Sequence, residues 1–146
     1  MPSQDSPDDT FLNSSSPPQL VALRGEALAC QHLQSIGFTV EAVNWRAGRL
    51  AEIDVIASHP LKQLLVFVEV KTRHPHSVCT AYDALAQPSK QRRWLKAVSL
   101  YMQGQPMRWQ AYQPRLDLIV VTYLANECQR YRLEHLENIL GDDHTP

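Results

Sequence analysis

Charged residues stand inside two short apolar stretches of the chain. Asp54 lies within LAEIDVIA, and Glu69 and Lys71 lie within LLVFVEVKTR. Charged side chains rarely occupy apolar strands unless they are paired or bind a metal. Alternate residues of a strand share a face, so Glu69 and Lys71 project to one side and Glu52 shares the side of Asp54. If the two stretches pair as strands, three carboxylates and one ammonium group converge.

A D…E-x-K arrangement has the groups that metal-dependent phosphodiester hydrolysis requires. Asp and Glu carboxylates are hard oxygen ligands that hold Mg²⁺ or Mn²⁺ together with water and substrate oxygens, and the Val70 carbonyl is a further candidate ligand. The metal polarises the phosphate and lowers the pKa of a bound water. Lys71 would position or deprotonate that water, or stabilise the charge of the transition state. A plain salt bridge of Asp54 or Glu69 with Lys71 is the alternative.

The charge distribution favours a polyanionic partner. The formal net charge is -1, yet residues 44–115 hold 11 Lys plus Arg and only 4 Asp plus Glu. A basic region around a small acidic centre suits a nucleic acid held at a metal site, although a solvated basic surface gives the same pattern. The candidate nucleic-acid contacts are Arg46, Arg73, Lys90 and Arg93.

Length and composition indicate one globular domain. The chain has 146 residues, of which 44% are hydrophobic and 20% charged. We expect a disordered tail over 1–15, a single domain over 16–140 and a frayed C-terminus over 141–146. The three cysteines are far apart and form neither a metal-binding pair nor a disulfide framework. No signal peptide and no transmembrane run is visible, so a cytoplasmic location is expected.

Local patterns predict the elements that position these residues. A helix is expected from Ser16-Pro17 to about Ile36, ending at Gly37, and a second from Lys90 to Gln103, ending at Gly104. The expected strands are Phe38–Arg46, the two apolar stretches with a polar break over 58–63 between them, Leu116–Leu124 and an edge strand at Tyr131–Leu133. The remaining expectations are a basic turn over 44–49, a loop with a short helical turn over 72–87, and a helical turn at 136–140.

Glu26 on the first helix is a fourth candidate acid. It lies on the same side as the apolar face expected at Leu23, Ala27 and Cys30, with Leu33 at its edge. It is therefore either directed toward the site or placed at the border of the buried face, where an arginine (Arg24 or Arg46) would pair with it.

Three further features have competing interpretations. Trp45 either stacks on a base or packs in the core, and packing is the commoner outcome. His74 and His76 are two apart in an irregular region, but no Cys or His partner stands at metal-site spacing, so a surface or phosphate contact is favoured over zinc. Asp117 is expected to pair with Arg115 or to hold the second helix.

Several motifs occur in a recognisable order over about residues 23–123. They are R-G-E at 24–26, E-I-D-V-I-A at 52–57, V-F-V-E-V-K-T-R at 66–73, Lys90 with Arg93, and R-L-D-L-I-V at 115–120. Together they resemble the core of the PD-(D/E)xK nuclease superfamily. More specifically, they resemble the YraN-like family of uncharacterised bacterial proteins, which is similar to archaeal Holliday-junction resolvases. Ala51 stands where that family usually has Gly before E-I-D, which would alter the turn into the strand slightly.

The resemblance implies an α/β fold with a mixed central β-sheet flanked by helices, the restriction-endonuclease-like core. It implies that Glu26, Asp54, Glu69 and Lys71 are catalytic and that Asp54, Glu69 and Val70 hold Mg²⁺ or Mn²⁺. The leading hypothesis is a metal-dependent endonuclease that acts on nucleic acid, branched DNA included. The alternatives are a nucleic-acid-binding protein with little or no activity and a structural protein that keeps the acids as a salt-bridge cluster. A homodimer fits a resolvase, but nothing in the sequence fixes an interface.

Overall fold

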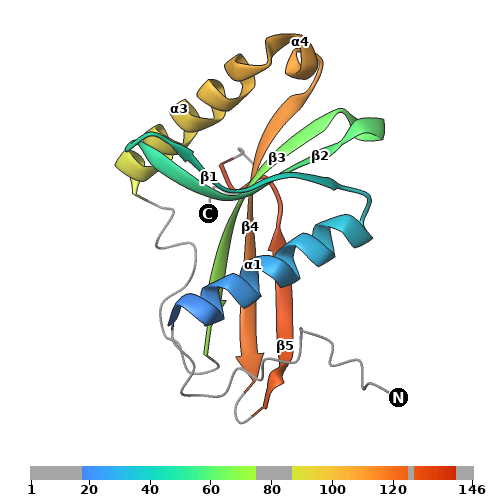
Figure 1. Cartoon of the computed structure of the whole chain (residues 1–146), viewed down its shortest axis with the longest axis vertical. Helices are drawn as coiled ribbons and strands as arrows, with labels where there is room; N and C mark the ends of the chain where they lie inside the picture. Colours follow the sequence, from blue (N-terminus) through green and yellow to red (C-terminus); the bar gives the residue numbers. More distant parts are fainter. Residues whose placement is uncertain (1–17, 75–86, 125–126, 141–146) are drawn as a thin grey trace, which may run out of the picture.

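The structure, a computed structural model, describes residues 18–74, 87–124 and 127–140 (Figure 1). Its elements in chain order are α1 (Pro18–Ser35), β1 (Thr39–Ala47), β2 (Ala51–His59), the 3-10 helix η1 (Pro60–Lys62), β3 (Leu64–Arg73), α3 (Pro88–Gly104), α4 (Pro106–Trp109), β4 (Gln113–Leu124) and β5 (Glu127–Leu136). The expected tail over 1–15, the helix start at Ser16-Pro17, most of the loop over 72–87 and the C-terminus from 141 lie outside the described residues.

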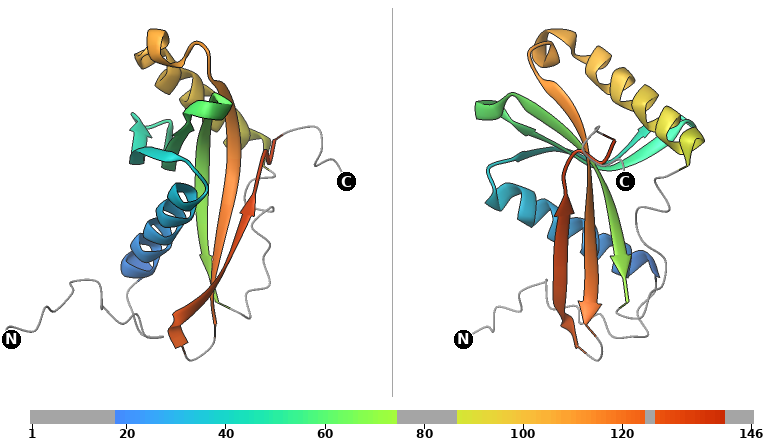
Figure 2. Two further views of the ribbon diagram at one scale, coloured as in Figure 1. Left: turned by 90° about the vertical axis from the view of Figure 1, so that its right-hand side faces the viewer. Right: turned by 180° about the vertical axis from the view of Figure 1, so that it is seen from behind.

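The strands form one five-stranded mixed sheet in the order β1-β2-β3-β4-β5. β3 and β4 run parallel, and the other neighbours pair antiparallel. α1 lies across one face and α3 lies across the other, near the opposite end of the strands (Figures 1 and 2). The predicted α/β fold with a mixed central sheet flanked by helices is thus confirmed.

α1 packs on the sheet through small and branched residues. It ends as predicted, because Gly37 takes a φ of 97° that favours glycine and Phe38 N donates to Leu33 O at 3.0 Å. The expected apolar face is wrong in part, since Leu23 is 56% exposed and Ala27 is exposed, whereas Leu33, expected at its edge, is buried together with Leu28 and Ala29. The buried stripe is therefore rotated from Leu23 and Ala27 toward the Gly25 side of the helix.

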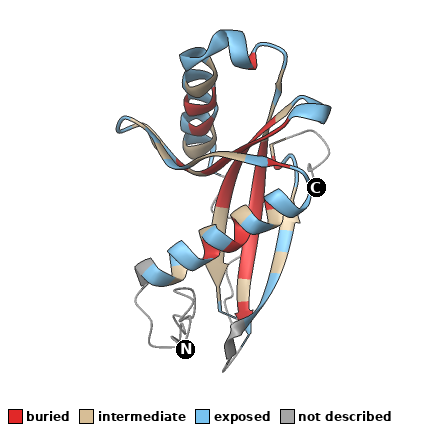
Figure 3. Ribbon diagram, turned by 45° about the vertical axis from the view of Figure 1, so that its right-hand side comes forward, coloured by how far each residue is buried: buried red, intermediate tan, exposed pale blue. Residues whose placement is uncertain are grey.

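α3 confirms the second predicted helix, including its end at Gly104. Trp94, Ala97 and Val98 are buried against the sheet, whereas Leu95 is 53% exposed. The core therefore has two layers, one under each helix, with β2, β3 and β4 between them (Figure 3).

The turns differ from prediction in where they begin. Ser58 and His59 still belong to β2 and are buried, so the polar break shrinks to η1 and Gln63. The basic turn starts only after Ala47, because β1 continues through Asn44 and Trp45.

The C-terminal expectations were half right. β5 is the predicted edge strand, extended in both directions. The helical turn over 136–140 is wrong: the chain bends at Asn138, whose φ is 54°, and Ile139 N donates to Leu116 O at 2.8 Å. Among the described helices, none combines the length and the apolar character that crossing a membrane requires.

Candidate functional site

Asp54 lies where β2 and β3 part from each other. Their ladder runs from His59 opposite Leu64 to Val55 opposite Val68. At the next position Asp54 Oδ2 accepts a hydrogen bond from Val70 N at 2.8 Å. The carboxylate thus takes the place of a strand carbonyl as acceptor, and this bond fixes Asp54 against the middle of β3.

Glu69 is a nearly buried carboxylate held by two ammonium groups. Its side chain is 9% exposed, and its Oε1 lies 3.0 Å from Lys71 Nζ and 3.3 Å from Lys90 Nζ. Lys71 comes from the same strand and Lys90 from the first turn of α3. A helix N-terminus disfavours a cation, so the contact with Glu69 compensates Lys90 there. A salt bridge of Lys71 with Asp54 or Glu69 was the alternative to a catalytic arrangement; the structure has it with Glu69, and Lys90 joins it.

The pKa of Asp54 reports the charges around it. Burial raises this pKa from an ordinary 3.8 to about 6, and repulsion by Glu69 and Glu26 adds to the rise, while the Val70 N–H and Lys71 oppose it. Glu26, Glu69 and Lys71 therefore all act on Asp54, from α1 and β3. A carboxylate whose pKa is raised by burial and by like charges is typical of a functional site.

Glu26 reaches this region because α1 lies close to β3. A Cβ on Gly25 would overlap the Thr72 methyl group, so only glycine permits this approach. Glu26 Oε2 accepts from Asn44 Nδ2 at 3.0 Å, so the partner is neither of the arginines that we expected. Arg46 instead lies 3.3 Å from Glu52.

Glu52 corrects one expectation about the cluster. Its side chain is 41% exposed beside Arg46, so the predicted convergence of three strand carboxylates does not include it. Ile53 is buried in the core under α3, which breaks the simple alternation from Glu52 to Asp54. Within the part of the chain that the structure describes, no group of three or more His, Cys, Asp or Glu is placed to hold a metal ion.

The candidate nucleic-acid contacts come from three elements. Arg46 is exposed on β1, Arg73 ends β3, and Lys90 and Arg93 lie on α3, where Arg93 Nε donates to Ser89 O at 3.4 Å. Contact of these four residues with a nucleic acid stays a prediction.

The remaining aromatic and imidazole candidates are placed in part. Trp45 packs edge-to-face on Tyr101, with 5.2 Å between ring centroids, which fits the packing alternative. His74 is exposed, and His76 lies outside the described residues.

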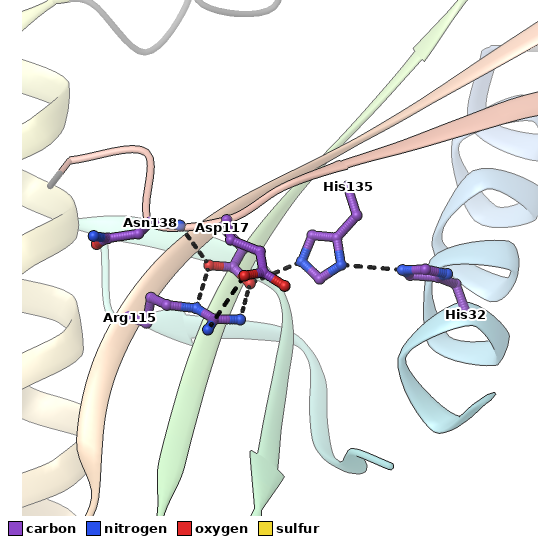
Figure 4. A network of polar contacts seen from close by, with 6 residues as sticks. His32, Arg115, Asp117, His135 and Asn138 are labelled. Carbon is purple, nitrogen blue, oxygen red and sulfur yellow. Dashed lines mark hydrogen bonds and ion pairs between the residues drawn. The ribbon is translucent and has the colours of Figure 1, made fainter. Parts of the chain in front are cut away.

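A second polar cluster was largely not predicted from the sequence (Figure 4). Asp117, fully buried on β4, accepts two hydrogen bonds from Arg115, each 2.9 Å long, and one from Asn138 N at 3.0 Å. Its Oδ2 also lies 2.8 Å from His135 Nε2, and His135 Nδ1 lies 3.0 Å from His32 Nε2 on α1. The Arg115 pairing was expected, but the two histidines are 103 residues apart and no local pattern joins them.

This network holds a buried negative charge. Burial would raise the pKa of Asp117, but hydrogen bonds from His135, Arg115 and Asn138 keep that pKa below its ordinary 3.8. Burial, and then His135, lower the pKa of His32. Its polar groups contact one another across α1, β4 and β5, so we interpret the cluster as a structural brace between these elements.

Comparisons with known proteins agree on one family. Residues 25–121 match the family model described as "Uncharacterised protein family UPF0102". A "UPF0102 protein" of Mycobacterium sp. (strain KMS) is 42% identical over 97 residues, which cover 66% of this chain and 69% of the relative. The "UPF0102 protein" of Mycolicibacterium gilvum is 37% identical over 119 residues, 82% of this chain and 92% of the relative. That of Oleidesulfovibrio alaskensis is 38% identical over 110 residues, 74% of this chain and 51% of the relative.

Proposed function

The chain belongs to the uncharacterised protein family UPF0102, and from its site we propose that it is a metal-dependent endonuclease that hydrolyses phosphodiester bonds in DNA. The family match bears out the YraN-like resemblance, and it carries no activity with it. The proposal rests on the arrangement of the site residues.

The observation that carries the proposal is the junction of Asp54 with β3. Asp54 is bonded to Val70 N, the residue between Glu69 and Lys71, so both carboxylates and the ammonium group lie along one short stretch of β3. A salt bridge alone would need only Glu69 and Lys71. The cost of burying a second carboxylate, Asp54, beside the first is better explained by a function that uses both.

The donor set fits Mg²⁺ or Mn²⁺. Asp54 and Glu69 supply carboxylate oxygens and Val70 supplies a carbonyl, and Mg²⁺ is usually held by one or two carboxylates with water and substrate phosphate completing its shell. Glu69 and Glu26 raise the pKa of Asp54 by like-charge repulsion, and a divalent cation would neutralise this negative charge. When bound, the ion would polarise the phosphate and lower the pKa of a water molecule.

Each site residue then has a distinct role. Asp54 and Glu69 bind the ion, with Val70 O as a third ligand. Lys71, held 3.0 Å from Glu69, orients the attacked phosphate or the water and offsets negative charge in the transition state. Glu26, held by Asn44, adds negative charge toward Asp54 and orients water from the α1 side.

Arg46, Arg73, Lys90 and Arg93 are the proposed contacts to the nucleic acid. The alternative function is nucleic-acid binding with little or no cleavage, because Lys71 and Lys90 already neutralise Glu69 in this structure. A cytoplasmic location and a homodimer remain predictions from the sequence.

The deciding experiment is a cleavage assay on labelled linear, flap and four-way-junction DNA with Mg²⁺, Mn²⁺ or EDTA, beside the D54A variant. Cleavage that needs the metal and disappears in D54A supports the proposal. A salt-sensitive mobility shift without cleavage favours the binding alternative. If the protein neither shifts nor cleaves any of these substrates, the nuclease and the binding hypotheses are both rejected.

A further inference from the structure

The C-terminal ends of β3 and β4 and the start of β5 have one face with no described helix over it. α1 packs against β1 to β4 on one side of the sheet. On the other side α3 packs over β1 and β2 and, through Trp94, Ala97 and Val98, over the first halves of β3 and β4. Seen from behind, the far halves of β3, β4 and β5 lie in front of α1 with no helix across them (Figure 2, right). We call this surface, which Arg73, Thr122 and Arg132 cross, the open face.

The strand register places these three residues in one row. Arg73 lies opposite Thr122 on β4, and Thr122 lies opposite Arg132 on β5. Opposed residues of neighbouring strands project to the same face. That face points away from α1, because Thr72 contacts α1 at Gly25 and adjacent strand residues alternate.

β5 gives an independent check of this orientation. Leu133 packs in the core layer under α1, and His135 contacts His32 of α1. Arg132 and Glu134 alternate with them and therefore face the other way. Neighbouring strands lie about 5 Å apart, so the backbones of Arg73 and Arg132, which are two strands apart, are separated by roughly 10 Å across the sheet.

The row lies next to the candidate site. Lys71 precedes Arg73 by two residues on β3, a rise of roughly 7 Å along the strand, and both project to the open face. Lys71 is opposite Val120, which is opposite Glu134. The row therefore lies two residues beyond the register of Lys71 and carries its two arginines from β3 to the sheet edge at β5.

Arg132, at the β5 end of the row, is accessible and forms only an exposed ion pair, whereas Arg73 and Thr122 are half-buried. The Arg132 side chain is 67% exposed, and its partner Glu134, at 3.4 Å, is 52% exposed. An exposed pair of this kind contributes little to stability and exchanges readily for another anion. Guanidinium forks bind phosphate oxygens in pairs, and a threonine hydroxyl donates to phosphate as well.

We infer that the open face binds the phosphodiester backbone of DNA, with Arg73, Thr122 and Arg132 contacting phosphates next to those at Lys71. This inference rests on the proposed function and extends it to β4 and β5. It assigns Arg132 and Thr122 a role in positioning the substrate. Contacts of this kind hold the duplex in place without reading its sequence.

The test is the salt dependence of DNA binding by the full chain. The probe is a fluorescein-labelled double-stranded DNA, read by anisotropy in EDTA over a NaCl series so that no cleavage occurs. Each phosphate that a variant no longer neutralises lowers the magnitude of the slope of log Kobs against log[salt] by about 0.9. We expect that reduction in R132A and in R73A, and its recovery in R132K.

The matched control is K62A, because Lys62 is an exposed cation in η1, away from the open face. Its slope should equal that of the unchanged chain, and circular dichroism should show that all variants are folded. If the unchanged chain binds DNA but R132A and R73A keep its slope, the open face is overturned and the proposed function survives. If the unchanged chain shows no salt-dependent binding, both are overturned.

Discussion

Asp117 on β4 and His135 on β5 are joined by a contact of 2.8 Å between Oδ2 and Nε2 (Figure 4). Through this contact a fully buried carboxylate of a central strand is tied to the edge strand and, by way of His32, to α1. The arrangement is a brace that fixes α1, the helix carrying Glu26, to β4 and β5.

Removing the carboxylate should destabilise the fold strongly. In D117A the Arg115 guanidinium, whose side chain is 17% exposed, loses its main partner, and breaking such a pair costs about 3–5 kcal/mol of unfolding free energy. Urea denaturation followed by circular dichroism measures the loss. E52A is the control, since Glu52 forms an exposed pair and should change stability by less than about 0.5 kcal/mol. Equal effects in the two variants would contradict the role of the brace.

His32 should make the fold sensitive to mild acid. Its pKa is lowered in the folded protein, so the unfolded chain takes up the proton first as pH falls below an ordinary 6.5. The contribution of neutral His32 to the free energy of unfolding is therefore fully present above that pH, and it decreases as the pH drops through the pKa of the folded state. In H32Q, which keeps a side chain able to donate or accept, melting temperature should vary less between pH 7 and pH 5. A profile that matches the unchanged chain would exclude His32 as the source.

Asp54 should lower stability at neutral pH. Its folded pKa of about 6 lies above the ordinary 3.8, so the folded state resists its ionisation and stability declines between these two values as pH rises. In EDTA, D54N should be more stable than the unchanged chain above pH 6, by on the order of 2 kcal/mol, and the difference should vanish near pH 4. The asparagine oxygen still accepts from Val70 N. Mg²⁺ or Mn²⁺ should raise the melting temperature of the unchanged chain only, and equal shifts in D54N would count against the metal site.

Lys71 should matter for cleavage more than for binding. We expect K71A to reduce cleavage by at least about 100-fold, because the group that offsets transition-state charge is gone, while DNA binding is largely kept. Single-turnover cleavage and anisotropy on the same DNA separate the two effects. K62A serves again as the control, and retained cleavage in K71A would remove Lys71 from the mechanism.

The approach of α1 to β3 should depend on Gly25. In G25A the new methyl group overlaps the Thr72 methyl group, and overpacking of this kind costs about 1–3 kcal/mol despite the better helix propensity of alanine. The second variant, T72S, removes the methyl group that causes the overlap. Thermal melts of the single and double variants should therefore show G25A/T72S to be more stable than G25A. If the losses of melting temperature in G25A and T72S simply add in the double variant, contact between residue 25 and Thr72 does not set the distance between α1 and β3.

The sequence predicted the elements well because their signals are local. Glycines 37 and 104 end α1 and α3, and apolar runs mark β2, β3 and β4. The faces of the helices were predicted less well: Gly25 and Ala29 have little hydrophobicity of their own, yet they are buried because small residues allow the close approach. On α3, likewise, the small Ala97 is buried whereas the more hydrophobic Leu95 is exposed.

The candidate site was predicted in part for a similar reason. Glu69 and Lys71 are neighbours on one strand, so their pairing follows from a spacing of two residues. The partners from elsewhere, Asn44 for Glu26 and Lys90 for Glu69, depend on how helices dock on the sheet, which no local pattern specifies. The His32–His135–Asp117 contacts join three elements and were therefore missed, apart from Arg115.

The single parallel strand pair, β3 with β4, has a consequence for the order of folding. β1, β2 and β3 are joined by short turns, so Asp54, Val70 and Lys71 come together through contacts between residues close in sequence. The parallel pair requires the chain to close a long loop through α3 and α4 first, and such non-local contacts form slowly. We expect the β1–β3 meander to acquire hydrogen-exchange protection early and β4–β5 late, so that the carboxylate pair is assembled before the brace that fixes α1 to β4 and β5.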